Sequence, residues 1–117
     1  MSMLMSIGKR GENAARSYLL KRGFVFIEAN WRYKHKEIDL IFKDKNNLIV
    51  FIEVKTRRAL KENNIPFYAK QNKNIKEAAL NYCLKNKIKL ENVRFDLIII
   101  LYKNNQASLC HYLDICR

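Results

Sequence analysis

The chain has 117 residues, 49% of them hydrophobic, which predicts one domain spanning residues 1–117 with a single core and no second module. Its 23 Lys and Arg against 11 Asp and Glu give a net charge of +12. Such an excess is typical of nucleic-acid-binding proteins, because each neutralised phosphate releases counterions, although a merely solvated lysine-rich surface is the alternative. The 3 cysteines are odd in number and form no CxxC pair, which argues against a disulfide framework or a zinc site.

The first part of the chain predicts a helix and then a strand. The helix is expected near residues 6–22, and Gly23 stands where it should stop. Its residues at helical spacing are Gly11, Ala15, Tyr18, Leu19 and Arg22. The β-rich run 24–29 follows, and a basic-aromatic connector occupies residues 30–35.

The rest of the chain predicts four more strands and a second helix. Residues 37–43 and 48–56 are strand candidates joined by turn-forming residues, and residues 57–68 form an irregular basic segment. An amphipathic helix covers about residues 69–86, with a stripe of Ile75, Ala78, Ala79, Tyr82 and Cys83. Residues 93–102 form a buried strand and residues 107–115 an edge strand. The order is αβββαββ, a mixed sheet with helices against it.

No targeting or membrane-spanning segment is expected. Residues 1–7 lack a charged region followed by a long apolar run, so they do not resemble a signal peptide. The longest apolar stretch, residues 97–102, is far too short to span a bilayer. We therefore expect a cytoplasmic protein with no membrane partner.

The hairpin formed by the second and third strands is the most informative part of the sequence. If residues 45–47 form its loop, counting outward sets Asp39 opposite Glu53 and Glu37 opposite Lys55. Directly opposed residues share a face, with Cβ atoms about 4.5–5.5 Å apart. One face then holds Glu37, Asp39, Ile41, Phe51, Glu53 and Lys55, and the other holds Ile38, Leu40, Phe42, Val50, Ile52 and Val54. A bulge or a two-residue turn would shift this register.

The opposition of Asp39 and Glu53 needs a cation nearby, because like charges directly opposed repel. Lys55 alone could supply it, as part of an ordinary charge network on a half-exposed sheet. A divalent cation between the carboxylates would do so better, and hard oxygen ligands without His or Cys suit Mg²⁺ or Mn²⁺ rather than zinc. The spacing alone leaves both alternatives open.

A wider set of motifs carries a family resemblance. The motifs are Gly8-Xaa-Xaa-Gly11-Glu12, Asn30-Trp31-Arg32, Glu37-Ile38-Asp39-Leu40-Ile41, Phe51-Ile52-Glu53-Val54-Lys55-Thr56-Arg57, Lys70-Gln71 and Arg94-Phe95-Asp96. They resemble the PD-(D/E)XK nuclease superfamily and, more narrowly, the YraN-type family of bacterial endonuclease-like proteins, which is similar in fold to archaeal Holliday junction resolvases. The resemblance covers nearly the whole chain. One departure is Lys36, where the family commonly has Gly.

The resemblance implies a restriction-endonuclease-like α/β fold, with a mixed central sheet flanked by helices. It implies that Asp39 and Glu53 bind Mg²⁺ or Mn²⁺, that Glu12 completes the acidic set, and that Lys55 orients or activates the attacking water. Glu37 would be a secondary member of the site. The implied activity is hydrolysis of DNA phosphodiester bonds, branched or junction DNA included. The alternative is a non-catalytic nucleic-acid-binding module that keeps the fold, and a homodimer is compatible with either.

Several other polar residues are interpreted around this site. The expected nucleic-acid contacts, with DNA as the partner, are Arg32, Arg57, Arg58, Lys70, Gln71 and Lys73. Gln71 is equally compatible with a satisfied boundary residue, and Trp31 with stacking on unpaired bases or with core packing. Asp96, after Arg94 on an apolar strand, indicates a structural ion pair, whereas His35 and His111 have no partner spacing and are interpreted as incidental.

Overall fold

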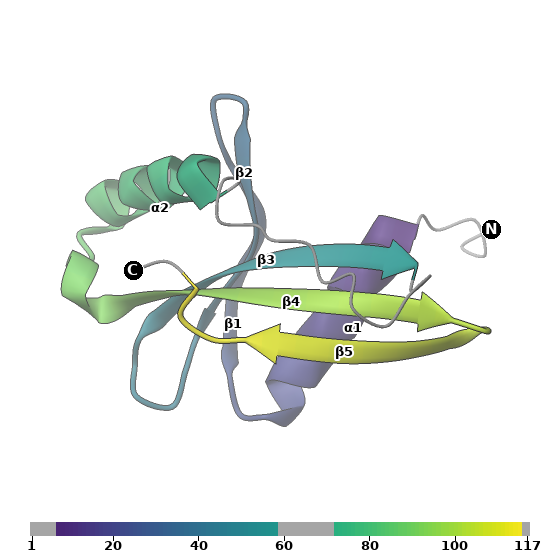
Figure 1. Cartoon of the computed structure of the whole chain (residues 1–117). Helices are drawn as coiled ribbons and strands as arrows, with labels where there is room; N and C mark the ends of the chain where they lie inside the picture. The colour runs from purple at the N-terminus through teal and green to yellow at the C-terminus, as the bar shows by residue number, and fades with distance from the viewer. Residues whose placement is uncertain (1–6, 59–71, 116–117) are drawn as a thin grey trace.

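The computed structural model describes residues 7–58 and 72–115, with the backbone alone for residues 7–8 and 72–74 (Figure 1). The elements in chain order are α1 (Ile7–Lys21), β1 (Val25–Tyr33), β2 (Lys36–Lys43), β3 (Ile49–Arg58), α2 (Asn72–Asn86), the short 3₁₀ helix η3 (Leu90–Asn92), β4 (Val93–Lys103) and β5 (Gln106–Tyr112). The strands form one five-stranded sheet in the order β1-β2-β3-β4-β5. Only β3 and β4 pair in parallel. The predicted mixed α/β class is confirmed.

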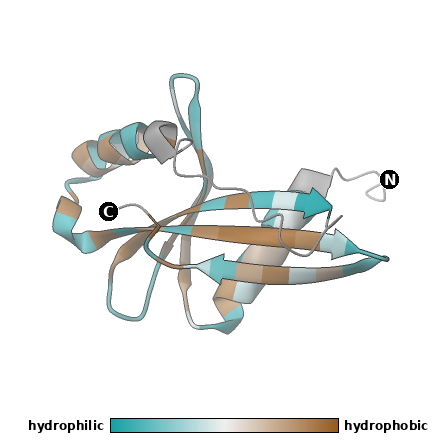
Figure 2. Cartoon of the chain, in the orientation of Figure 1, coloured by the Kyte–Doolittle hydropathy of each residue, from teal (hydrophilic) through white to brown (hydrophobic). Residues whose placement is uncertain are grey.

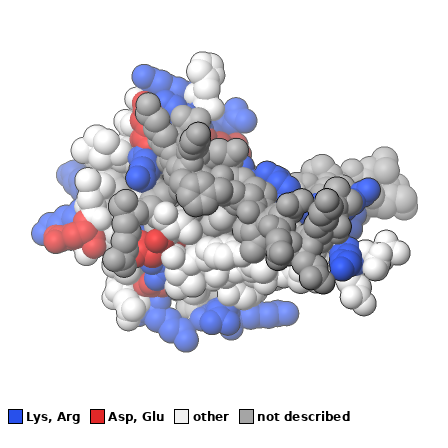
Figure 3. All heavy atoms as spheres, viewed as in Figure 1, with Lys and Arg blue, Asp and Glu red and all other residues white. Residues whose placement is uncertain are grey.

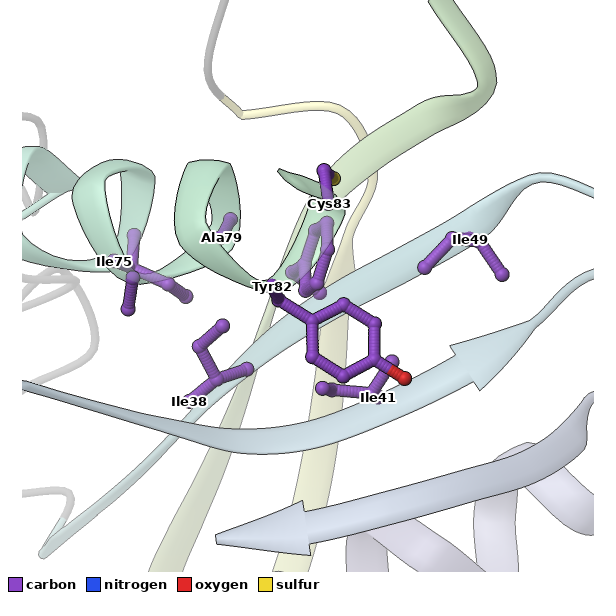
Figure 4. Close-up of a cluster of buried hydrophobic side chains, with 9 residues drawn as sticks. Ile38, Ile41, Ile49, Ile75, Ala79, Tyr82 and Cys83 are labelled. Atoms are coloured by element: carbon purple, nitrogen blue, oxygen red, sulfur yellow. The ribbon is translucent and has the colours of Figure 1, made fainter. Parts of the chain in front are cut away.

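The two helices cover opposite faces of the sheet. The cluster on the α1 face consists of Ala15, Leu19, Leu40, Phe42, Val50, Ile52, Ile98 and Ile100. The cluster on the α2 face consists of Ile38, Ile41, Ile49, Phe51, Ile75, Ala78, Ala79, Tyr82 and Cys83 (Figure 4). The predicted apolar stripe of α2 is therefore confirmed. Near their shared turn, β2 and β3 are covered on both faces, so their residues there are apolar on both sides. Figure 2 shows that β4 is also hydrophobic along much of its length.

Helix α1 ends in a local motif and lies unusually close to β3. Its end is closed by hydrogen bonds from Gly23 N to Leu20 O at 3.1 Å and from Phe24 N to Leu19 O at 3.0 Å, with Gly23 at φ +89°. Near its start, a Cβ added to Gly11 would lie 2.2 Å from Thr56 Oγ1. The missing side chain therefore allows the first turns of α1 to pack directly on β3.

The predicted connector 30–35 is wrong, because β1 continues to Tyr33 and only Lys34 and His35 form the turn to β2. The Trp31 ring packs edge-to-face on Tyr82 of α2, with ring centroids 5.3 Å apart. Of the two alternatives for Trp31, core packing is therefore the one observed. The charged residues between the aromatic ones suggested a connector, although this segment is a strand whose apolar side chains are covered by α2.

The predicted register of the β2–β3 hairpin is confirmed next to the turn. Leu40 pairs with Ile52 and Phe42 with Val50, and Asp44 N donates to Leu48 O at 3.0 Å. The ladder, however, ends at Leu40 and Ile52, so Asp39 and Glu53 do not form the predicted ladder pair.

The predicted face is also wrong for Ile38, which packs with Ile41 and Phe51 instead of Leu40. In β1, Ala29 pairs with Leu40 and Trp31 with Ile38, and Asn30 between them adopts a left-handed φ of 54°. This interruption breaks the alternation of sides along both strands. Beyond it, the end of the β1–β2 hairpin stands clear of the rest of the sheet beside α2 (Figure 1).

Among the described residues, no helix is long and apolar enough to cross a membrane.

Candidate metal centre

Asp39 lies at the point where β2 parts from β3. The backbone N–H of Val54 donates to Asp39 Oδ2 at 2.8 Å, so a side-chain carboxylate accepts the hydrogen bond where the backbone ladder has ended. The strands separate here because the carboxylate lies between them. This bond fixes Asp39 beside Val54, the neighbour of Glu53 along β3.

Asp39 is also the centre of a carboxylate cluster. Its pKa is raised to about 6, chiefly by burial and also by the nearby negative charges of Glu12, Glu53 and Glu37, against the hydrogen bond from Val54, which lowers it. The fold therefore brings the predicted acidic residues into electrostatic contact, from α1, β2 and β3. Glu12 reaches this group because Gly11 holds α1 against β3.

Glu53 and Lys55 project from the same side of β3, two positions apart. Lys55 Nζ lies 2.8 Å from Glu53 Oε1, with side chains 25% and 15% exposed respectively. The other oxygen, Glu53 Oε2, is buried and has no hydrogen-bond partner among the described residues. The ion pair is what a charge network predicts, but a buried carboxylate oxygen without a partner is costly. Glu53 Oε1 thus supports the charge network, and Glu53 Oε2 supports a metal site; the sequence left both alternatives open.

The donor set fits a hard divalent cation. Asp39 and Glu53 offer only carboxylate oxygens, which suit Mg²⁺ or Mn²⁺. Across residues 7–58 and 72–115, no group of three or more His, Cys, Asp or Glu side chains is arranged to enclose a metal ion by itself. Magnesium does not require such a cage, since it usually keeps several waters and binds one or two carboxylates together with substrate phosphates. The buried Glu53 Oε2 and the nearby Asp39 carboxylate meet that smaller requirement.

The described basic residues of the predicted interface lie on strands. Arg57 and Arg58 end β3 as exposed residues, not as part of the irregular segment predicted for residues 57–68. Arg32 on β1 is 76% exposed and pairs with Glu37 at 3.0 Å. Figure 3 shows Lys and Arg side chains at several places on the visible face, including the end of the β1–β2 hairpin at the top. Lys70 and Gln71 lie outside the described residues, and Lys73 is described only as backbone of α2.

A second polar cluster is buried on the α1 face. Asp96 is 0% exposed and binds Arg94 Nε at 2.9 Å, so the predicted ion pair is confirmed. The interpretation of His111 as incidental is wrong: its Nε2 lies 2.8 Å from Asp96 Oδ2, and its Nδ1 lies 3.0 Å from Tyr18 Oη. Burial alone would raise the pKa of Asp96, but hydrogen bonds from His111 and Arg94 outweigh it and hold that pKa below its ordinary value.

This cluster is structural. Arg94 also binds Asp44 of the β2–β3 turn at 2.8 Å, so the cluster joins that turn, α1, β4 and β5. Asp96 pairs with Ile52 and shares its face, whereas Glu53 points to the opposite face. No short motif spacing could have found His111, because its partners Asp96 and Tyr18 lie 15 and 93 positions away in the sequence.

Comparison with known proteins identifies the relatives of the chain. Residues 11–100 match the family model described as "Uncharacterised protein family UPF0102". A UPF0102 protein of Dictyoglomus thermophilum is 41% identical over 112 residues, covering 92% of this chain and 92% of the relative. One of Trichlorobacter lovleyi is 36% identical over 110 residues, covering 92% and 87%. One of Chlorobium phaeobacteroides is 40% identical over 101 residues, covering 84% and 78%. The relatives bear the family's name and no activity, and the matched range includes Glu12, Asp39, Glu53 and Lys55.

Proposed function

Because this chain belongs to the UPF0102 family of YraN-type proteins, we propose that it is a metal-dependent endonuclease of restriction-endonuclease-like fold that hydrolyses DNA phosphodiester bonds. The observation that carries the proposal is the buried, unpartnered Glu53 Oε2 close to the Asp39 carboxylate. Two acidic groups are held together at the divergence of two strands, and one of their buried oxygens, Glu53 Oε2, has no hydrogen-bond partner among the described residues. A divalent cation is the counter-charge that this arrangement suits.

Each residue of the site has a role in this chemistry. A bound Mg²⁺ or Mn²⁺ would supply polarisation of a phosphate and a lowered pKa of a bound water. Asp39 and Glu53 would hold the metal, with Glu12 completing the acidic set and Glu37 at its margin. Lys55, fixed by Glu53 Oε1 at 2.8 Å, would orient the attacking water and stabilise the negative charge that develops on the phosphate.

The surrounding charge supports a polyanionic substrate. The net charge is +12, and the exposed Arg57 and Arg58 lie two and three positions after Lys55 on β3. Arginine binds phosphate oxygens through a planar set of donors, without reading the base sequence. We assign Arg57 and Arg58 to contacts with the DNA backbone, and retain Arg32, Lys70, Gln71 and Lys73 as predicted contacts. Branched or junction DNA is within the proposed substrate class.

The second candidate is a nucleic-acid-binding module without cleavage. The Lys55–Glu53 ion pair favours it, because a lysine that already neutralises the glutamate partly removes the need for a metal. This module would keep the basic surface and the fold, and it would bind DNA with or without Mg²⁺.

A nuclease assay separates the two candidates. Purified protein is incubated with labelled branched, single-stranded and duplex DNA in Mg²⁺, Mn²⁺ or EDTA, alongside Glu53→Gln. We expect metal-dependent cleavage by the wild type, none by Glu53→Gln, and binding of DNA by both in EDTA. Binding without cleavage of any substrate would favour the module, and absence of binding at low salt would overturn both candidates.

A further inference from the structure

The end of the β1–β2 hairpin carries three basic side chains, of which Arg32 is ion-paired with Glu37 and Lys36 with Glu77. Residues 32–37, Arg-Tyr-Lys-His-Lys-Glu, contain Arg32, Lys34 and Lys36 against one acid, Glu37. Tyr33 pairs with Lys36, and Lys34, at φ 57°, forms the turn with His35. Lys34 and His35 are exposed, and Arg32 is 76% exposed. The hairpin end stands clear of the rest of the sheet, so these charges are presented outward (Figures 1 and 3).

This hairpin end is braced against α2. Trp31 packs edge-to-face on Tyr82, Lys36 forms an ion pair with Glu77, and Ile38 is buried in the α2 cluster (Figure 4). The brace holds the strands near their tip, at positions where an isolated hairpin would be marginally stable. A rigid element loses little conformational entropy on binding, so its contacts translate more fully into affinity.

The same strand connects the hairpin end to the candidate metal centre. Lys36 precedes Asp39 by three residues, which at a rise of about 3.3 Å per residue gives roughly 10 Å, and Lys34, in the turn beyond it, lies farther away but at most roughly 17 Å from Asp39. A duplex advances about 3.4 Å per base pair, so these spans correspond to about three to five base pairs. A duplex that places a phosphate at Asp39 and runs along β2 would therefore meet the hairpin end within half a helical turn.

We propose that the β1–β2 hairpin is a rigid second contact with duplex nucleic acid, in which Lys34 binds a backbone phosphate about three to five base pairs from the bond that is cut. This inference rests on the proposed function and adds to it a defined position of the duplex relative to the bond that is cut. An exposed turn lysine is commonly just a solvated charge. Here the brace from α2 and the direct continuity with Asp39 favour a defined contact. Lysine at a phosphate carries no sequence information, so the hairpin sets position along the duplex, not base preference.

The chain provides a matched control at the other end of β2. Lys45 is also an exposed lysine in a hairpin turn, and Lys45→Ala removes the same charge as Lys34→Ala. The Lys45 side chain approaches Gly23 at the end of α1, on the far side of the turn from Asp39. A duplex that contacts Asp39 and Lys34 runs away from Lys45.

The first measurement is the salt dependence of binding to a labelled duplex in EDTA. Each phosphate contact contributes about 0.9 to the slope of log affinity against log salt. We expect Lys34→Ala to lower that slope by about 0.9 and Lys45→Ala to leave it unchanged. Equal changes in the two variants would mean that net charge alone acts, and would overturn the inference.

The second measurement locates the contact. Single neutral methylphosphonate linkages are placed at each position around the cut site, and cleavage rates are measured with Mg²⁺. A linkage about three to five base pairs from the cut should slow the wild type and not Lys34→Ala. Identical profiles for the two proteins would overturn the inference even if both cut. A wild type that binds without cutting would overturn the proposed endonuclease, while the salt slopes would still decide the hairpin contact; no binding would overturn both.

Discussion

Asp39 Oδ2 accepts the backbone hydrogen bond of Val54 at 2.8 Å, so the carboxylate that we propose as a metal ligand also lies where the β2–β3 ladder ends. The surroundings of Asp39 act on the charge of its carboxylate in opposite directions. The hydrogen bond favours the ionised carboxylate, while burial and the charges of Glu12, Glu53 and Glu37 disfavour it. Without a cation, Asp39 should therefore destabilise the folded protein whenever it is ionised.

The first prediction is a pH-dependent gain in stability for Asp39→Asn. The folded pKa is raised from 3.8 to about 6, so the folded state holds a proton that the unfolded state has lost over this range. Stability from this group is thus fully present below pH 3.8 and is lost as pH rises through about 6. The loss amounts to at most about 3 kcal/mol, since the two states differ by some two pKa units.

Urea unfolding in EDTA at pH 5 and pH 7.5 tests this prediction. Asn can still accept the Val54 hydrogen bond, so the variant removes the charge and keeps the contact. We expect Asp39→Asn to gain stability relative to the wild type, more at pH 7.5 than at pH 5. A variant that is equally destabilised at both values would show that the carboxylate is not electrostatically strained.

The second prediction concerns metal binding in thermal unfolding. A ligand that binds only the folded protein adds about 2.7 kcal/mol at a hundredfold excess over its Kd. Mn²⁺ should therefore raise the Tm of the wild type but not that of Asp39→Asn or Glu53→Gln. Glu91→Gln, which changes an exposed acid on η3, is the matched control and should respond like the wild type.

The charge-network alternative gives the opposite pattern. There, Glu53→Gln weakens its pairing with Lys55, lowers the Tm without metal and leaves the response to Mn²⁺ unchanged. A wild type with no Tm shift at millimolar Mn²⁺ and no cleavage of any DNA would lead us to abandon the enzyme in favour of the binding module.

The third prediction is that Arg57 and Arg58 bind DNA without sequence preference. Phosphate oxygens are the same at every base pair, so replacing both arginines by Ala should lower affinity similarly for unrelated duplexes of the same length. The salt slope should fall by up to about 1.8, the share of two phosphates. Fluorescence anisotropy with several duplexes measures both quantities. A loss confined to one sequence would show that these arginines contact bases instead.

The fourth prediction separates the buried Asp96 cluster from the site. Asp96→Asn leaves His111 without its carboxylate partner and Arg94 with Asp44 alone, and breaking such a buried pair costs about 3–5 kcal/mol. We expect a large fall in unfolding free energy at pH 7, with metal-dependent cleavage retained by the folded fraction at a permissive temperature. Loss of cleavage in fully folded protein would indicate that this cluster also contributes to the reaction.

The sequence predicted the β2–β3 register because the turn itself specifies it. Asp44 accepts hydrogen bonds from Asn46 N at 2.8 Å and Leu48 N at 3.0 Å, so the loop length follows from local chemistry. The position of Ile38 could not be predicted, since it depends on the left-handed Asn30 in a neighbouring strand. A prediction that assumes strict alternation of side-chain directions along a strand does not include such an interruption.

The candidate site was predictable to a similar extent. Asp39, Glu53 and Lys55 belong to one hairpin, so their proximity follows from strand geometry. The coupling of Glu12 to Asp39 depends on how α1 lies on β3, and the chain's spacing contains no measure of that packing. The same holds for His111, which has a role only after β5, β4 and α1 have come together.

The absence of a side chain at position 11 of α1 contributes to the raised pKa of Asp39 on β2, through the position of Glu12. A Cβ there would lie 2.2 Å from Thr56 Oγ1, so a Gly11→Ala chain must rotate Thr56 or lift α1 away from β3. When the helix lifts, Glu12 withdraws from Asp39, and the pKa of Asp39 falls towards its ordinary value. The close packing of α1 on β3, which the glycine permits, thus adds the charge of Glu12 to the effect of burial on the proton affinity of the Asp39 carboxylate.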